Sequence, residues 1–450
     1  MATSQTAPRL QPGLLARIEE ARGRTDALFQ LLLPDSLYER PVEERHRFIF
    51  YVGHLEAFDW NLLGPTLGLT PHDQDFDKLF AFGIDPVGGG LPTDTPADWP
   101  TISQVEDYVR TTRQRLDENL RDPRALRSGG SQLTDGTLLH VAIEHRLMHA
   151  ETLAYLMHNL PLEKKISQMR VAADRRVAPK NYKIAIPAGI ATLGQSRIGS
   201  GAFGWDNEFG AQEIPVREFS IDAFPVTNSE YIKFVQAGGY ESPAYWTESD
   251  WKWKQAERLE HPHFWVKHPH STATGKGTLW EYRAMFGNIP LPLPWPAYVS
   301  HAEASAFARW ARAKLPTEAQ WHRAAYGTPE GVERQFPWGD SEPDANRGNF
   351  HHRRWDPHPV DAHPRGASAF GVYDLLGNGW EWTSTQFAPL PGFEPFPFYK
   401  GYSANFFDGQ HFVMKGGSSR TDECMLRRSF RNWFQPHYPY LYATFRCVEE

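Results

Sequence analysis

The feature that most constrains the fold of this chain is a change in its hydrophobic pattern near residue 180. From Leu14 to about Leu162, apolar residues recur three and four positions apart, which is typical of amphipathic helices. From Tyr182 onward, short β-like runs such as residues 184–186 alternate with turns. A chain of 450 residues is too long to fold around a single hydrophobic core. The sequence therefore predicts an α+β protein with two domains of different class.

The first domain is predicted to be a four-helix bundle spanning residues 1–165. A polar and basic connector at residues 166–182 leads to the second domain at residues 183–450. The bundle helices are expected at residues 12–32, 42–63, 101–121 and 135–159. The irregular stretch between the second and third helices, residues 76–100 with Gly88-Gly89-Gly90, is long enough to indicate a functional loop. The second domain contains two convincing helical patterns, at residues 228–237 and 299–313.

Composition excludes several classes of function. With 40% hydrophobic and 22% charged residues and no apolar run near the roughly 18 to 20 residues of a membrane span, a soluble protein is expected. The N-terminus lacks the pattern of a secretory signal, which favours the cytoplasm. A net charge of −7 provides no cationic stripe for nucleic acid. Two cysteines provide neither a disulfide framework nor a cysteine-based zinc site.

A pair of histidines is the sharpest local signal for a metal. His145 and His149 lie four residues apart in a helical stretch, so both side chains project from one face about one turn apart. At roughly 100° per residue, His140 lies about 140° around the helix from His145, and His158 lies about 180° from His149. Both therefore fall on other faces of the helix. Taken alone, such a pair on a helix more often serves packing than metal binding.

A third ligand has to come from another helix of the bundle, where facing helices build metal sites. His54 is the best candidate, whereas His46 lies eight residues earlier among charged residues. A metal ion bound by three neutral imidazoles would keep further coordination positions open for other ligands. That arrangement suits either zinc hydrolysis or iron chemistry with O2.

The second domain carries a dense series of motifs. They are Pro187-Ala188-Gly189, residues 226–231 and 237–240, Leu315-Pro316-Thr317-Glu318-Ala319-Gln320-Trp321, Phe336-Pro337-Trp338-Gly339-Asp340, Leu376-Gly377-Asn378-Gly379-Trp380-Glu381-Trp382-Thr383 and Lys415-Gly416-Gly417-Ser418. Together they resemble the formylglycine-generating-enzyme family, which implies a loop-rich, C-type-lectin-like fold. Formylglycine enzymes use a closely spaced cysteine pair, but Cys424 and Cys447 are 23 residues apart. That activity is therefore not expected here.

The two halves together resemble the EgtB-type sulfoxide synthases and the related SenA-type selenoneine synthases. In that family a DinB-like helical bundle supplies three histidines to Fe(II), and the second domain contributes substrate-binding residues. The resemblance implies Fe(II) ligation by His54, His145 and His149. It also implies O2-dependent joining of sulfur or selenium to imidazole C2 of Nα-trimethylhistidine (hercynine), with a sulfoxide or selenoxide as first product.

Residues that bind hercynine are implied by the segment Arg431-Asn432-Trp433. In the family, the corresponding Asn and Trp hold the substrate. An indole face suits a quaternary ammonium, which cannot donate a hydrogen bond, and an amide can fix the polar end. Met148 stands where the family often has a glutamine that touches the substrate imidazole.

The donor site departs from the branch that uses γ-glutamylcysteine. That branch has an Asp directly after the Asn-Trp pair and an Arg four residues later, where this chain has Phe434 and Tyr438. Residues 76–100 contain no Arg or His that could hold a second carboxylate. Aromatic residues can stack on a sugar, so the resemblance favours a selenosugar donor, as in SenA-type enzymes. Cysteine as the sulfur donor of an ergothioneine-type synthase is the alternative.

The proton donor of the family's sulfoxide synthases is also missing. A tyrosine follows the Trp-Glu-Trp-Thr motif in the γ-glutamylcysteine branch, whereas residues 384–387 read Ser-Thr-Gln-Phe here. Tyr399, Tyr438, Tyr440 and Tyr442 are the candidates for this role, and Tyr438 and Tyr440 are selected as catalytic residues. Two other hypotheses remain, namely a three-histidine zinc hydrolase or thiol transferase, and a non-catalytic binding module with a vestigial histidine cluster. The number of subunits is not predicted.

Overall fold

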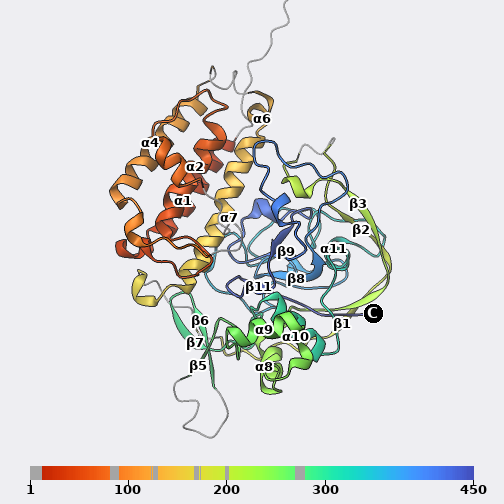
Figure 1. Ribbon diagram of the computed structural model, residues 1–450. Coiled ribbons are helices and arrows are strands. Elements are labelled where there is room, and N and C mark those ends of the chain that lie inside the picture. The colour runs from red at the N-terminus through yellow and green to blue at the C-terminus, as the bar shows by residue number, and fades with distance from the viewer. Residues whose placement is uncertain are drawn as a thin grey trace, which may run out of the picture. The chain divides into compact units, whose positions relative to one another are not determined.

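A computed structural model describes residues 13–81, 91–122, 124, 130–166, 172, 174–197, 202–268 and 279–450. The chain forms two compact units, Met1–Gln168 and Met169–Glu450. The first is helical and the second contains all the described strands (Figure 1). The predicted α+β class, with helices preceding a strand-rich domain, is confirmed. Among the described residues, no helix combines the length and apolar character needed to cross a membrane.

Besides short 3-10 turns, the described part of the first unit contains four long α-helices and two short ones. They are α1 (Leu14–Phe29), α2 (Phe48–Leu63), α3 (Gln74–Leu79), α4 (Ile102–Leu120), α6 (Gly130–Thr134) and α7 (Thr137–Asn159). The four long helices correspond to the four predicted ones. Helix α7 is buried along most of its length, and it packs against both α1 and α2. It is therefore the central helix of the unit.

Helix α4 shows how the sequence sets a helix in this unit. Thr101 caps its N-terminus by accepting a hydrogen bond from the main-chain N–H of Gln104, and the Gln104 side chain accepts from the N–H of Thr101. Its buried residues recur at helical spacing and form one apolar stripe: Val105, Tyr108, Thr112, Leu116 and Leu120. Burial of this stripe rather than intrinsic propensity stabilises the helix.

The structure corrects the predicted start of the second helix. Helix α2 begins at Phe48 rather than Val42, because Arg47 adopts an extended conformation. The Arg47 guanidinium donates to the carbonyl of Tyr38 and to the carboxylate of Asp94, at 2.6 and 2.9 Å. These distant partners outweigh the local helical pattern. The predicted irregular stretch contains the end of α3, and Gly88-Gly89-Gly90 lies outside the described residues.

The second unit is built from short strands in four small sheets. The strands are β1 (Lys183–Ile186), β2 (Gly189–Leu193), β3 (Gln212–Val216), β4 (Phe219–Asp222), β5 (Trp265–Lys267), β6 (Trp280–Ala284), β7 (Gly287–Pro290), β8 (Gly379–Gln386), β9 (Phe412–Gly417), β10 (Asn432–Phe434), β11 (Ala443–Thr444) and β12 (Val448–Glu449). Their orders are β1-β4-β12, β10-β9-β8-β11, β2-β3 and β5-β6-β7. Strand β10 pairs antiparallel with β9, which places Trp433 opposite Val413.

The described α-helices of the second unit are α8 (Asn228–Gln236), α9 (Glu248–Ala256), α10 (His301–Trp310) and α11 (Glu318–Tyr326). Helices α8 and α10 were predicted, whereas α9 and α11 were not. Neither missed helix has the one-sided burial of α8: only Asp250 is buried in α9, whereas all nine residues are buried in α11, so no apolar stripe marks either one in the sequence. Their caps were visible in the sequence, since Thr247 caps α9 and Thr317 forms a capping box with Gln320 on α11.

The Trp-Glu-Trp-Thr segment of β8 has a structural role. Glu381 is fully buried, and its carboxylate accepts hydrogen bonds from Trp321 and, at two oxygens, from Arg446. Trp382 donates to the carbonyl of Val299. These bonds join α11, β8 and the end of the chain around one core. Most of this motif therefore stabilises the core around β8, which belongs to the same sheet as β10.

Candidate functional site

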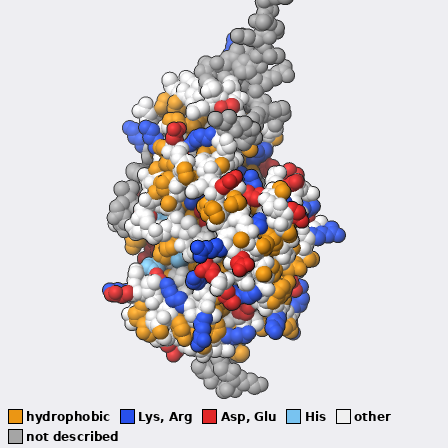
Figure 2. Space-filling model, turned by 90° about the vertical axis from the view of Figure 1, so that its right-hand side faces the viewer, with side chains coloured by type: hydrophobic (Ala, Val, Ile, Leu, Met, Phe, Trp, Pro, Cys, Tyr) orange, Lys and Arg blue, Asp and Glu red, His pale blue; other side chains and the backbone are white. Residues whose placement is uncertain are grey.

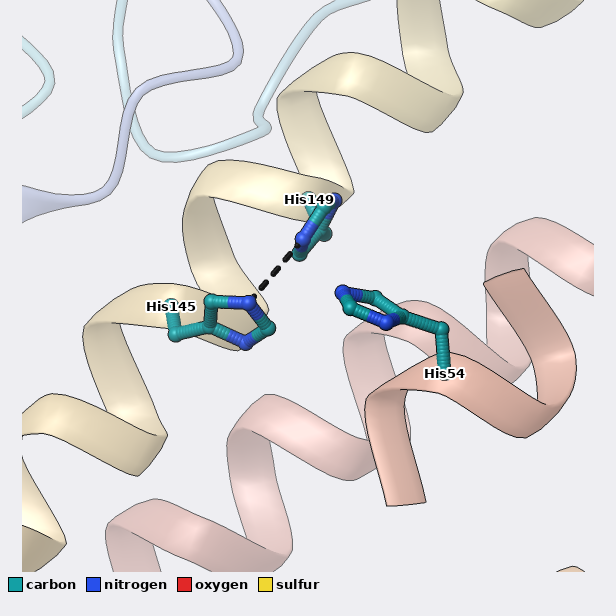
Figure 3. A group of neighbouring side chains, drawn as sticks. All are labelled: His54, His145 and His149. Atoms are coloured by element: carbon teal, nitrogen blue, oxygen red, sulfur yellow. Dashed lines mark hydrogen bonds between the residues drawn. The ribbon is translucent and has the colours of Figure 1, made fainter. Parts of the chain in front are cut away.

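Three buried histidines come together inside the first unit. His54 lies on α2, and His145 and His149 lie one turn apart on α7, with their rings directed at one another (Figure 3). One ligand atom from each residue lies within 4.8 Å of the others. The residues that the sequence predicted as metal ligands are therefore neighbours. His46, His140 and His158 are not members of this group.

The distances fit a single metal ion. Nε2 of His145 and Nε2 of His149 are 3.1 Å apart. Two nitrogens that each lie about 2.1 Å from one ion, at a right angle, are about 3.0 Å apart. Because both nitrogens approach the same point from one helix face, the pair needs little rearrangement to bind a metal. His54 adds the third imidazole from the opposite helix.

The protonation state of the histidines also favours metal binding. Burial lowers the pKa of His54 to about 4, despite the opposing hydrogen bond with the carbonyl of Phe80. Burial likewise lowers the pKa of His145 and of His149 well below the usual value, with the neighbouring imidazoles acting in the same direction. All three rings are neutral near pH 7. A neutral imidazole has the lone pair that a metal requires.

Aromatic rings surround the three histidines. The ring of Phe58 lies parallel to His145 with the centroids 3.4 Å apart and 10° between the planes. Phe50 stacks on His54 at 4.8 Å, and Tyr51 lies 5.7 Å from His149. These contacts restrict rotation of the imidazoles. They also limit the number of water molecules that can reach the ring nitrogens.

A buried charged group lies next to the histidines on the same two helices. Arg146 of α7 forms ion pairs with Glu56 and Asp59 of α2, at 2.9 and 2.8 Å, and donates to the carbonyl of Leu55. Burial alone would raise the pKa of Glu56, but the guanidiniums of Arg146, Arg113 and Arg22 lower it to about 2. The sequence did not indicate this group, although Arg146 directly follows His145.

The residues predicted to bind hercynine lie mainly on β10 of the second unit. Trp433 stacks on Phe387 with centroids 4.2 Å apart and 6° between the planes, and the edge of Tyr402 lies 5.4 Å away. The Asn432 side chain accepts a hydrogen bond from the main-chain N–H of Trp433. Both side chains are half-buried. Met148, also half-buried, precedes His149 on α7 of the first unit.

A buried ion pair that no sequence pattern indicated supports strand β10. Arg431 donates two hydrogen bonds to Glu318, at 2.9 and 3.1 Å, and its guanidinium lies 5.1 Å from the ring centre of Phe387. The chain of contacts therefore runs from Glu318 through Arg431 and Phe387 to Trp433. These four residues lie in sequence segments that are far apart in the chain, and only the fold brings them together.

The candidate donor residues form an aromatic row. Phe434 stacks on Tyr438 at 5.4 Å, and Tyr440 meets Tyr438 edge to face at 5.0 Å. The neighbouring His437 is held by Asp250 of α9, at 2.8 Å, and stacks on Trp253 at 4.7 Å. The sequence did not indicate this anchor, because α9 was not predicted.

Family models match both parts of the chain. The sulfatase-modifying factor enzyme 1-like domain matches residues 168–450, and the DinB superfamily matches residues 17–153. The chain belongs to the sulfatase-modifying factor enzyme 1-like family. With the DinB match in front of it, this membership confirms the predicted EgtB-type family. The match does not distinguish the SenA branch from the rest of the family.

Relatives of this family member agree with that assignment. The hercynine oxygenase of Mycobacterium tuberculosis is 39% identical over 54% of this chain and 55% of its own length. Ergothioneine biosynthesis protein 1 of Neurospora crassa is 28% identical over 94% of this chain and 56% of its own length. The formylglycine-generating enzyme of Mycobacterium tuberculosis is 30% identical over 45% of this chain and 75% of its own length. The chain thus spans little more than half the length of the first two relatives.

Proposed function

We propose that this protein is a mononuclear non-haem iron enzyme that uses O2 to form a C–Se or C–S bond at imidazole C2 of Nα-trimethylhistidine. The observation that carries the proposal is the buried group of His54, His145 and His149 in the DinB-matching part of the chain. The similarity to a hercynine oxygenase supports hercynine and O2 as the substrates that belong with this group.

The proposed ligands are His54, His145 and His149. Bound there, Fe(II) would supply redox chemistry and open coordination positions for the donor, the imidazole and O2. The protein's own contribution is to keep the three imidazoles neutral and fixed. The parallel rings of Phe58 and His145 serve the second purpose, because a stacked imidazole cannot rotate without losing its packing.

The overall reaction is balanced with O2 as the only oxidant. The Se–H or S–H bond of the donor and the C2–H bond of the imidazole break, and the new C–Se or C–S bond forms. One oxygen atom stays on the chalcogen as a selenoxide or sulfoxide, and the other leaves as water. No external reductant is required.

Hercynine is proposed to bind through Asn432, Trp433 and Met148. The indole of Trp433 suits the trimethylammonium, because a cation is attracted to an aromatic face. One face of that indole is covered by Phe387, and the rings of Tyr402 and Phe406 lie 5.4 and 5.6 Å away, so the cation is proposed to approach the opposite face. The Asn432 amide provides a donor for the substrate carboxylate.

The donor is proposed to be a selenosugar. Phe434 and Tyr438 stand where the γ-glutamylcysteine branch has a carboxylate and a guanidinium, and they stack on each other. An aromatic row with hydroxyl groups matches a neutral sugar better than a charged peptide. Tyr438 and Tyr440 are the proposed proton donors. Cysteine, as in an ergothioneine-type synthase, is the alternative donor.

The proposal is tested by an aerobic assay of Fe(II)-loaded protein with Nα-trimethylhistidine. Cysteine, γ-glutamylcysteine and a selenosugar are offered in parallel, and products are followed by mass spectrometry. We expect the selenium adduct to form fastest. A cysteine adduct formed preferentially would assign the protein to the sulfur branch, and no adduct with any donor would overturn the proposed reaction. Turnover without O2 and iron would favour zinc-dependent hydrolysis or thiol transfer.

A further inference from the structure

One histidine of the metal group has a main-chain partner that defines its tautomer. Nδ1 of His54 lies 2.7 Å from the carbonyl oxygen of Phe80. A carbonyl can only accept a hydrogen bond, so the proton of the neutral imidazole must be on Nδ1. Nε2 is then the nitrogen with a free lone pair. Partners of this kind orient metal-binding histidines, and losing them commonly weakens metal binding about 10- to 100-fold.

Gly53 allows Phe80 to approach α2 closely enough to make this hydrogen bond. A Cβ atom at Gly53 would lie 2.5 Å from each of three ring atoms of Phe80, which is closer than carbon atoms can pack. The Phe80 ring is fully buried. Three aromatic rings enclose it, with centroids at 5.5 Å for Phe76, 5.9 Å for Tyr108 and 6.2 Å for Trp99. The ring can therefore move aside only together with its main chain. A side chain at position 53 would therefore push Phe80 away from His54.

A second contact holds the short helix that ends at Phe80. Helix α3 has six residues and one buried carboxylate, Asp77. The hydroxyl of Tyr108 on α4 donates to this carboxylate at 2.7 Å. The Asn61 side chain of α2 donates to the main-chain carbonyl of Asp77 at 3.3 Å. A helix this short is not stable by itself, so its position depends on such contacts.

We propose that α3 is a positioning element for the metal site, held by Gly53 and by the Tyr108–Asp77 hydrogen bond, and that it presents the Phe80 carbonyl to His54. Its role is to fix Nε2 of His54 as the nitrogen that binds the metal. Gly53, Asp77, Phe80 and Tyr108 are not among the proposed metal ligands or substrate-binding residues. The inference rests on the proposed metal site and adds the residues that orient one of its ligands.

The test is the affinity for Co(II), measured by absorption and by chelator competition on the full chain. Gly53→Ala should move the Phe80 carbonyl, and Tyr108→Phe should release α3 while keeping the aromatic packing. We expect each change to weaken Co(II) binding about tenfold or more, with altered absorption bands from a displaced imidazole. In NMR spectra of ¹⁵N-histidine-labelled apoprotein, the Nδ1–H signal of His54 is identified by its absence in His54→Ala. Gly53→Ala and Tyr108→Phe should both lose this signal.

Matched controls separate this role from a general loss of stability. Gly23→Ala on α1 is also a glycine replacement in a helix, but it meets no atom within 4 Å. Tyr38→Phe also removes a tyrosine hydroxyl, but that hydroxyl donates to the carbonyl of Pro100 at 3.0 Å rather than to a residue of α3. Both controls should bind Co(II) within twofold of the parent protein.

The outcomes distinguish the inference from the proposed function. If the parent protein binds no Co(II) or Fe(II), the proposed metal site itself is wrong. If the parent binds and folded Gly53→Ala or Tyr108→Phe binds equally well with the same spectrum, the positioning role is wrong. Should Gly53→Ala fail to fold, Tyr108→Phe decides the question.

Discussion

Arg146 on α7 donates a 2.8 Å hydrogen bond to the carboxylate of Asp59 on α2. Both side chains are buried, and the same guanidinium pairs with Glu56 one turn earlier on α2. These two helices also carry the three histidines, and Arg146 lies between His145 and His149 in the chain. The ion pairs therefore fix the register of the two helices at the level of the metal group.

Replacing Arg146 with Met should destabilise the protein strongly. The change leaves the buried carboxylate of Asp59 without its ion-pair partner, while Glu56 keeps its ion pair with Arg113, and breaking a buried pair costs about 3 to 5 kcal/mol. The free energy of unfolding is measured with urea. Arg121→Met, which removes an exposed ion pair with Glu19, should change it by about 1 kcal/mol or less. Equal effects of the two changes would contradict a role for the buried ion pairs in stability.

Replacing any one of His54, His145 and His149 with Ala should remove bound iron and activity together. Two imidazoles hold a divalent ion far less tightly than three, and no other histidine belongs to the group within the described residues. Iron content is measured by elemental analysis after reconstitution. His140→Ala on the same helix is the control and should retain iron. A ligand variant that keeps both iron and activity would disprove that assignment.

Trp433→Leu should weaken hercynine binding by about 3- to 30-fold, the range expected for a lost cation–π contact. The comparison ligand is imidazolepropionate, which lacks the ammonium group, and its affinity should change little. Trp338→Leu is a suitable control, because Trp338 is also a half-buried indole stacked on a phenylalanine, Phe336. Dissociation constants come from calorimetry. An equal loss for both ligands would indicate a packing role for Trp433.

Asp374 should make the stability of the second unit depend on pH. Burial raises the pKa of Asp374 from 3.8 to about 8, although Asn378 donates to it and Arg446 attracts it. The folded protein then keeps a proton that the unfolded chain releases above about pH 4. The stabilisation from this proton is fully present below pH 3.8 and is lost as the pH rises toward 8.

The variant Asp374→Asn, which cannot titrate, measures this contribution. Relative to it, the parent protein should lose stability between pH 4 and 8 with a slope of up to about 1.4 kcal/mol per pH unit. Urea unfolding at several pH values gives the slope. Glu330→Gln, at an exposed position, should follow the parent. Parallel pH profiles of Asp374→Asn and the parent would show that Asp374 is ionised in the folded protein.

The class of each part could be read from the sequence because it depends on local periodicity. Four long helices, a strand-rich second part and the pairing of His145 with His149 all follow from spacing along the chain. The family motifs led to the correct family for the same reason, since they lie in contiguous segments. Helices α9 and α11 were missed because neither has a one-sided apolar pattern: only Asp250 is buried in α9, and all nine residues are buried in α11.

Only the tertiary structure decided which distant residues meet. The sequence determined that His145 and His149 share a helix face, because a helix turns by a fixed angle per residue. It could not determine that the carbonyl of Phe80 reaches His54, that Asp59 meets Arg146, or that Phe387 covers one face of Trp433. These contacts depend on how helices and strands pack, and packing is set by the shapes of many side chains at once rather than by any local pattern.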